Sequence, residues 1–316
     1  MGINYLLTLQ NLRENVLGGQ WNDIAVWISD FIVGFWPWAF VAIVYWSLDK
    51  KWGRLFLLNL SLGSLLNGFL KMTACVYRPW IKDARVIPAG DAITLATGYS
   101  FPSGHSTASV EFYGTTALWQ RKKRPWISCL MLFLIALTLF SRNFLGVHTP
   151  QDVVVGFFAT TAVLFINLRF LSWMEADLKK REWIAIAVIA GLAIFDFLYL
   201  NLKSYPLDYV NGILIVDPQK MKPDSYEGIG ACIGFCIGWH ADNHFIHFEK
   251  VKNKVLAVCL DAVCLVPLYF INTSLLGAVQ GTIGRAAGKF LLWFTQFIYI
   301  MVIAPLLMKA VSKKKG

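Results

Sequence analysis

Charged residues are scarce in this chain of 316 residues: only 15% are Asp, Glu, Lys or Arg, whereas 57% are hydrophobic. A soluble domain carries about 25% charged residues, so this composition argues against a soluble enzyme. Apolar runs recur along the whole sequence, and a run of about 20 residues crosses the hydrocarbon core of a bilayer. We therefore expect an all-α fold, a polytopic membrane helical bundle.

Several other features are missing. The first 20 residues lack the basic start, apolar core and small-residue cleavage site of a secretory signal peptide. Of the six cysteines, all but Cys75 lie inside apolar runs, which argues against a disulfide framework or a zinc knuckle. No internal repeat or low-complexity linker divides the chain, so we expect a single membrane domain.

The apolar runs predict nine transmembrane helices, at approximately 25–46, 54–76, 104–119, 126–142, 151–170, 183–200, 226–243, 255–273 and 287–308. We divide the chain into an N-terminal segment (1–24), a core of spans one to six (25–200) and a three-span C-terminal region packed on the core (201–316). Within the N-terminal segment, Ile3–Leu17 is expected to be a short interfacial helix or a tail.

The formal charge of +10 would suit a nucleic-acid partner, but most of the 29 basic residues lie in alternate short loops between the spans. That distribution follows the positive-inside rule and gives no reason to expect nucleic acid. It predicts an N-terminus outside the membrane and a cytoplasmic C-terminus.

Three short polar stretches lie at span ends on the predicted outer face. They are Lys71-x6-Arg78-Pro79, Pro102-Ser103-Gly104-His105 and Ser141-Arg142-x5-His148-x3-Asp152. Arg78 and Arg142 supply planar forks of donors that match phosphate oxygens, and Lys71 adds a compact positive charge. The three cations therefore predict a phosphate site.

The second stretch supplies a helix start. Ser103 is a suitable N-cap for span three, which would leave the amides of Gly104 and His105 facing an anion. Gly104 has no side chain to keep an anion away from the backbone. We expect these groups to hold a phosphate oxygen throughout the reaction.

Two histidines divide the predicted chemistry. His148 and Asp152 are four residues apart, so the carboxylate can accept from one ring nitrogen and leave the other free to attack phosphorus. His105 is expected to protonate the leaving alkoxide and then to take a proton from the hydrolytic water. No metal or other cofactor is required, because three fixed cations neutralise the phosphate.

These three stretches resemble the signature motifs of the type 2 phosphatidic acid phosphatase (PAP2) superfamily, and every motif position matches. The resemblance implies a metal-independent phosphatase with His148 as nucleophile, His105 as acid and base, and Asp152 as the orienting carboxylate. It also implies phosphate binding by Lys71, Arg78, Ser103, Gly104 and Arg142. The apolar spans argue against the soluble acid phosphatases and haloperoxidases of that superfamily.

The substrate is less well defined. Residues 80–101 are rather apolar, and Trp80 and Tyr99 are aromatic types favoured at membrane interfaces. We therefore favour a lipid phosphate monoester or pyrophosphate, with membrane lipids as environment and substrate. The alternatives are a soluble ester such as glucose 6-phosphate, a phosphotransferase, and an anion-binding protein or transporter without turnover. The expected location is a bacterial plasma membrane, with the active site facing outside.

Three features stay outside this function. His240, His244 and His247 form an H-x3-H-x2-H pattern, interpreted either as a metal site or, by default, as an interfacial polar stretch. Gly230, Gly234 and Gly238 make a small-residue stripe that suits packing within the chain or in a homodimer. Asp196 and Asp261 lie inside spans, where a bare charge is costly.

Overall fold

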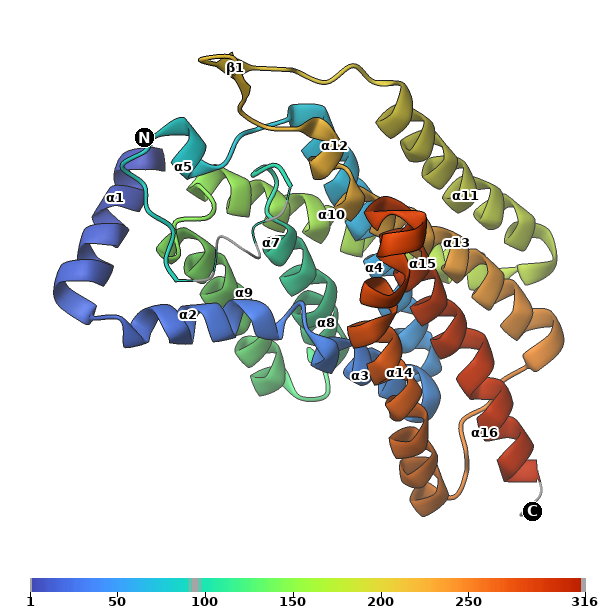
Figure 1. Cartoon of the computed structure of the whole chain (residues 1–316). Coiled ribbons are helices and arrows are strands. Elements are labelled where there is room, and N and C mark those ends of the chain that lie inside the picture. The colour runs from blue at the N-terminus through green and yellow to red at the C-terminus, as the bar shows by residue number, and fades with distance from the viewer. Residues whose placement is uncertain (1, 91, 93–95, 97, 314–316) are drawn as a thin grey trace. The chain divides into compact units, whose positions relative to one another are not determined.

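The computed structural model describes residues 2–90, 92, 96 and 98–313, and these are almost entirely helical (Figure 1). The first half contains α1 (Gly2–Leu12), η1 (Arg13–Leu17), α2 (Gln20–Phe31), α3 (Phe35–Ile43), η2 (Val44–Leu48), α4 (Lys50–Ala74), α5 (Pro79–Lys82), α7 (Gly104–Ser109), η3 (Val110–Gly114), α8 (Thr115–Gln120) and α9 (Pro125–Phe144). The second half contains α10 (Pro150–Ala176), α11 (Leu178–Leu202), β1 (Tyr209–Val210), β2 (Ile213–Leu214), α12 (Pro218–Met221), η4 (Pro223–Ser225), α13 (Tyr226–Ala241), η5 (Asp242–Ile246), α14 (Lys254–Ile283), α15 (Arg285–Ile298), η6 (Tyr299–Ile303) and α16 (Ala304–Lys313).

Within the described residues, seven helical segments are long and apolar enough to cross a membrane. They are Gln20–Leu48, Lys50–Lys82, Pro125–Phe144, Pro150–Ala176, Leu178–Leu202, Lys254–Ile283 and Arg285–Ser312. Large apolar side chains on several of them point outward, among them Phe158 on α10, Phe195 on α11 and Val258 on α14. An exposed apolar surface of this kind suits contact with lipid. The expected all-α bundle of membrane-type helices is confirmed at this level.

The two other predicted spans, 104–119 and 226–243, are also helical. The first corresponds to α7, η3 and α8, and the second to α13 and η5. Each contains a π-helical turn, at η3 and η5. Neither is among the seven long apolar segments, so the count of nine spans stays a prediction.

The first predicted span, 25–46, is interrupted. Helix α2 ends at Phe31 and α3 begins at Phe35. Pro37 in the first turn of α3 has no amide hydrogen to bond to the carbonyl four residues earlier, and Gly34 adds conformational freedom at the break. The apolar run alone predicts one continuous span, whereas Gly34 and Pro37 are the signals in the sequence that indicate the break.

The chain forms two compact units. The first contains Met1–Gly34, Leu66–Leu164 and Leu200–Ser225, and the second contains Phe35–Leu65, Phe165–Tyr199 and Tyr226–Gly316. All eight predicted site residues belong to the first unit. The predicted division at residues 24 and 200 stays a prediction.

In the first unit, helix α9 packs against α1, α2, α7 and α8. At the end of α9 an apolar cluster forms around Phe144, Leu145 and Val147, with Ala25 of α2 and Ala89 packed on it. This cluster anchors the loop that leads to His148. The β1–β2 hairpin (Figure 1) turns through Asn211-Gly212, both with positive φ, as the tightest hairpin turns require.

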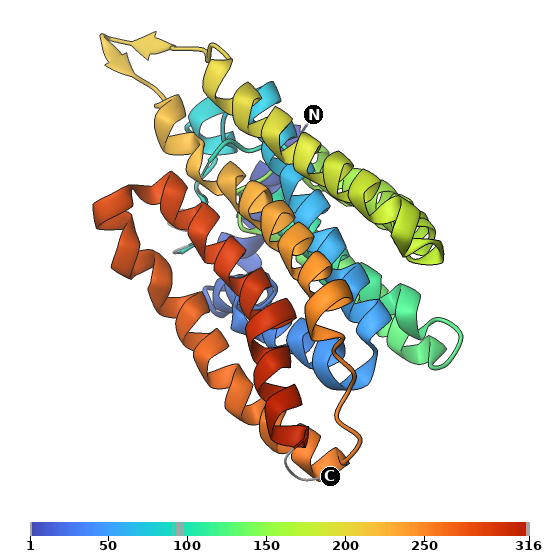
Figure 2. The ribbon, with the colours of Figure 1, turned by 90° about the vertical axis from the view of Figure 1, so that its right-hand side faces the viewer.

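In the second unit, α13 packs along α15, and α15 packs along α14 (Figure 2). The glycine stripe of α13 faces α15 and the following η6: side chains at Gly230 and Gly234 would collide with Phe290 and Phe297 of α15, and one at Gly238 with Met301 of η6. The stripe therefore serves close packing within the chain, and the homodimer stays a prediction. Asp261 of α14 accepts a hydrogen bond from Ser47 (2.9 Å), whereas the buried carboxylate of Asp196 has no partner among the described residues.

Candidate active site

Lys71 connects the first polar stretch to the second. Its side chain is 6% exposed, and Nζ donates to the carbonyl oxygens of Tyr99 (2.9 Å) and Pro102 (3.0 Å). Lys203 stabilises the end of the same helix, α4, by donating to the carbonyls of Met72 and Thr73. The two bonds from Lys71 hold its ammonium group beside the segment that precedes α7.

Arg78 connects the first stretch to the third. Its Nε donates to the carbonyl of Gly98 (3.1 Å), and its Nη1 donates to the carbonyl of Val147 (3.0 Å). The same Nη1 lies 3.0 Å from Nε2 of His148. Because a guanidinium group only donates, this contact requires a lone pair on Nε2 and places the proton of the neutral ring on Nδ1.

The other ring nitrogen of His148 faces Asp152 and Ser100. Nδ1 lies 3.7 Å from Oδ2 of Asp152 and 3.5 Å from the Ser100 hydroxyl. That hydroxyl donates to Asp152 Oδ2 (2.6 Å), which also accepts from the amide of Thr149 (2.8 Å). The carboxylate is thus fixed at the start of α10, on the side of the ring opposite Arg78.

The loop before His148 is held from several directions. Gly146 adopts a φ of +73°, a conformation that glycine reaches without strain, and the chain turns there towards His148. Asn143 donates to the His148 carbonyl (2.9 Å). Arg13, 2% exposed, donates to the carbonyls of Phe144 (2.8 Å) and Ile87 (2.7 Å). A residue of the N-terminal segment therefore stabilises the active-site loop.

Ser103 caps α7, because its hydroxyl accepts from the amide of Ser106 (3.3 Å). Its own amide donates to the Asp152 carbonyl (2.9 Å), which joins the second stretch to the third. Beside Gly104 there is open space, since a side chain there would meet nothing closer than Asn67 Oδ1 at 3.9 Å. No other described residue therefore crowds the backbone at the start of α7.

Two buried nitrogen atoms of the predicted site residues lack hydrogen-bond partners among the described residues. Arg142 is 1% exposed and its Nη1 donates to the Ser29 hydroxyl of α2, but its Nε has no acceptor. The Nε2 of His105 likewise has no hydrogen-bond partner. Buried polar atoms are rarely left unsatisfied, and a polar ligand bound at the predicted site would supply the partners that these two lack.

Electrostatics also connect these groups. His105 interacts with the charges of Arg142, Arg78 and Lys71 and with His148. The pKa of His148 lies well below its usual 6.5, because the ring is buried and Arg78 repels a second positive charge; the carboxylate of Asp152, which faces Nδ1, only partly opposes this shift. His148 is therefore neutral near pH 7, the form a nitrogen nucleophile needs.

Helices α4, α7 and α10 are joined behind the site. Asn67 donates to the Thr107 hydroxyl (2.9 Å), which also accepts from Thr160 (3.1 Å). Gly156, one turn after Asp152, allows α10 to approach the Ser103 carbonyl so closely that a Cβ would lie 2.9 Å from it. In the sequence, the role of Gly156 is indicated only by its position four residues after Asp152, which places both on the same face of a helix.

The site is thus built from all three stretches, and the structure brings each of the eight predicted residues into the first unit. In the apolar segment 80–101, from which a lipid substrate is predicted, Ile81 and Ile87 are exposed, Trp80 is half-buried over the Arg78 guanidinium, and Tyr99 is buried. Ile93 and Leu95 lie outside the described residues.

Comparison of the sequence with known proteins identifies a matching protein family. Residues 52–175 match the PAP2 superfamily. The expected resemblance is thereby confirmed over the stretch that bears every predicted site residue.

The chain is similar to particular members of that class. It is 25% identical over 214 residues to lipid phosphate phosphatase delta of Arabidopsis thaliana (65% of this chain, 49% of the relative). It is 34% identical over 125 residues to phosphatidylglycerophosphatase B of Bacillus subtilis (37% and 57%), and 33% identical over 90 residues to an undecaprenyl-diphosphatase of Sulfolobus acidocaldarius (27% and 39%). The chain thus spans roughly half the length of these relatives. No solved structure matches it significantly.

Proposed function

We propose that this protein is an integral membrane phosphatase that hydrolyses a lipid phosphate monoester or pyrophosphate through a phosphohistidine on His148. One observation carries the proposal. Lys71 and Arg142 are buried, and among the described residues neither has a carboxylate within ion-pair distance, although Asp224 and Asp152 act on Lys71 and Asp30 acts on Arg142 from further away. Arg142 Nε and His105 Nε2 also lack a hydrogen-bond partner among these residues. A buried cation without a close counter-ion is costly, and a phosphate group bound here would supply both the charge and the missing partners.

In the proposed first step, Nε2 of His148 gives its lone pair to phosphorus and the bond from phosphorus to the leaving oxygen breaks. Arg78, now 3.0 Å from Nε2, moves its N–H donors onto the phosphate oxygens. His105 supplies the proton that the leaving alkoxide needs. Asp152, held by Ser100 and Thr149, stabilises the positive charge that develops on the ring.

In the second step, water attacks the phosphohistidine and the N–P bond breaks. His105, deprotonated by the first step, takes a proton from that water. The products are inorganic phosphate and the free His148 ring. Lys71, Arg78 and Arg142 hold the phosphoryl oxygens in both steps, and no other residue is needed to neutralise their charge.

Three observations favour a lipid substrate. The named relatives include two lipid phosphatases and an undecaprenyl-diphosphatase. Ile81 and Ile87 expose apolar side chains on the segment that follows Arg78. The β1–β2 hairpin exposes Tyr209, Val210 and Ile213, and its neighbour Asp208 accepts a hydrogen bond from Tyr77. Exposed apolar side chains on this segment and on the hairpin suit a lipid that enters from the bilayer.

We further propose nine spans, with the N-terminus and the active site outside and the C-terminus cytoplasmic, in a bacterial plasma membrane. The alternation of basic loops supports this orientation. Single-cysteine variants in the loops, labelled in intact cells with a membrane-impermeant thiol reagent, test it: labelling outside at residue 85 and protection at residue 122 are expected.

Phosphate release by purified protein tests the function. The panel contains phosphatidic acid, phosphatidylglycerol phosphate, undecaprenyl pyrophosphate and glucose 6-phosphate, with His148→Gln as the inactive control. Turnover of a lipid that the variant has lost is the expected result. Turnover of the sugar phosphate alone would retain the mechanism and overturn the lipid substrate, and equal rates in both proteins would overturn the mechanism.

A further inference from the structure

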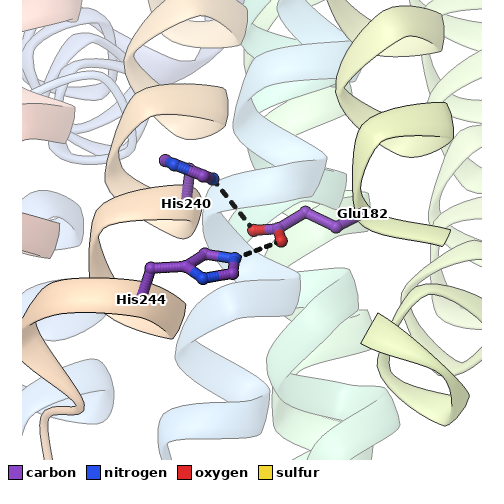
Figure 3. A group of neighbouring side chains, drawn as sticks. All are labelled: Glu182, His240 and His244. Carbon is purple, nitrogen blue, oxygen red and sulfur yellow. Dashed lines mark hydrogen bonds and ion pairs between the residues drawn. The ribbon is translucent and has the colours of Figure 1, made fainter. Parts of the chain in front are cut away.

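Three metal-ligating side chains converge in the second unit. Glu182 lies in the first turns of α11, His240 at the end of α13, and His244 in η5 (Figure 3). Nδ1 of His240 lies 3.2 Å from Oε1 of Glu182, and Nε2 of His244 contacts Oε2. Figure 3 shows both rings directed at the same carboxylate. The three ligand atoms all lie within 4.8 Å of one another.

The carboxylate is the unusual member. Glu182 is 2% exposed, and among the described residues its ion-pair partners are the two imidazoles and not a lysine or arginine; the neighbouring Arg181 donates instead to the Trp173 carbonyl. A buried carboxylate is costly unless it is paired with a cation or coordinates a metal. Asp242, which lies between the two histidines in sequence, is occupied by Lys50 and Arg54 and is not available to the cluster.

We propose that Glu182, His240 and His244 form a binding site for Zn²⁺ or a closely similar divalent transition metal. Two imidazoles and one carboxylate are a frequent zinc ligand set, with zinc–ligand distances of about 2.0–2.2 Å. Two such ligands at a tetrahedral angle lie roughly 3.4 Å apart. The 3.2 Å between His240 and Glu182 is close to that separation.

The surroundings allow metal entry and leave a coordination position open. The side chain of His244 is 49% exposed and that of His240 29%, so water and a metal ion can reach the centre. Trp183 and Phe245 lie against the His240 ring, with centroids 5.1 and 5.9 Å away. The bound ion would cross-link α11 to α13 and η5. His247, the third histidine of the pattern, is exposed and does not belong to the cluster.

Zinc content of the full chain tests this site. The protein is purified in detergent with a tag that contains no histidine, stripped with chelator, dialysed against Zn²⁺ and measured by mass spectrometry. To remove any contribution of the candidate catalytic histidines, all samples carry His105→Asn and His148→Asn. Wild-type residues at the cluster are expected to retain one zinc ion per chain. Glu182→Gln, His240→Gln and His244→Gln are each expected to lose it, whereas the matched control His247→Gln keeps it.

A zinc content no higher with the intact cluster than in the triple variant of Glu182, His240 and His244 would overturn the site. So would a loss of zinc in His247→Gln equal to that in His240→Gln. If the cluster variants do not fold, Co²⁺ added to the intact cluster provides a second measurement. Visible absorption bands of tetrahedral cobalt that Zn²⁺ displaces are expected, and their absence would leave only a hydrogen-bonded Glu–His–His cluster, contrary to the proposal.

Discussion

Replacing Asp152 with asparagine separates the orientation of His148 from the electrostatic stabilisation of its ring. The amide oxygen of asparagine can still accept from the Ser100 hydroxyl and the Thr149 amide, so the fold should persist. What is lost is a negative charge 3.7 Å from His148 Nδ1. As Nε2 bonds to phosphorus the ring gains up to one positive charge. At an effective dielectric constant of about 20, the lost attraction is about 4.5 kcal/mol.

Because the ring carries only part of that charge in the transition state, we expect kcat to fall by about 10²–10³. KM should change little, since Asp152 does not contact the phosphate. The assay is phosphate release from a substrate that the wild type turns over, with thermal unfolding measured in parallel. Asp83→Asn, which removes a surface carboxylate paired with Arg85, is the control and should retain activity. A folded Asp152→Asn protein with more than a tenth of the wild-type kcat would refute the assigned role.

Three other changes have defined outcomes. Because the pKa of His148 is held below 6.5 and only the neutral ring attacks, the decline of kcat/KM at acid pH should have its midpoint below pH 6.5; a midpoint at or above 6.5 contradicts this. Gly156→Ala, whose Cβ would lie 2.9 Å from the Ser103 carbonyl, should cost about 1–3 kcal/mol of unfolding free energy and reduce kcat. In the control Gly191→Ala the new Cβ would meet nothing within 4 Å, so this change should leave the unfolding free energy unchanged or raise it. Both are measured by denaturant titration, and an equal loss of unfolding free energy in the two variants would refute the close approach of α10 to the Ser103 carbonyl. Arg13→Gln should lower both Tm and kcat, because the hydrogen bonds to the Phe144 and Ile87 carbonyls are lost. An unchanged kcat would contradict a role of Arg13 in holding the active-site loop.

The sequence contains much of the candidate site because its chemistry depends on short spacings. Lys71 and Arg78, or His148 and Asp152, are near one another along the chain, and their residue types match phosphate chemistry. The helical character of the bundle follows from apolar runs in the same way. These local patterns do not depend on how distant segments meet.

Contacts between distant segments were not predictable. Arg13 reaches a carbonyl 131 residues away, and nothing in the N-terminal segment indicates that partner. Ser100 lies in an irregular loop, where spacing does not define direction. Glu182 is 58 residues from His240, so the histidine pattern alone could not reveal its carboxylate. Each of these contacts arises from tertiary packing rather than from helical periodicity.

The most direct test of the central claim is the capture of phosphate on His148 in a single turnover. A ³²P-labelled phosphomonoester is mixed with excess enzyme and quenched in alkali, in which phosphohistidine persists, and the labelled peptide is identified. We predict label on His148 within the time of one turnover, no label in His148→Gln, and accumulation in His105→Asn when the leaving group needs no proton. Phosphate release at the wild-type rate without any label on His148, or by His148→Gln, would contradict the account.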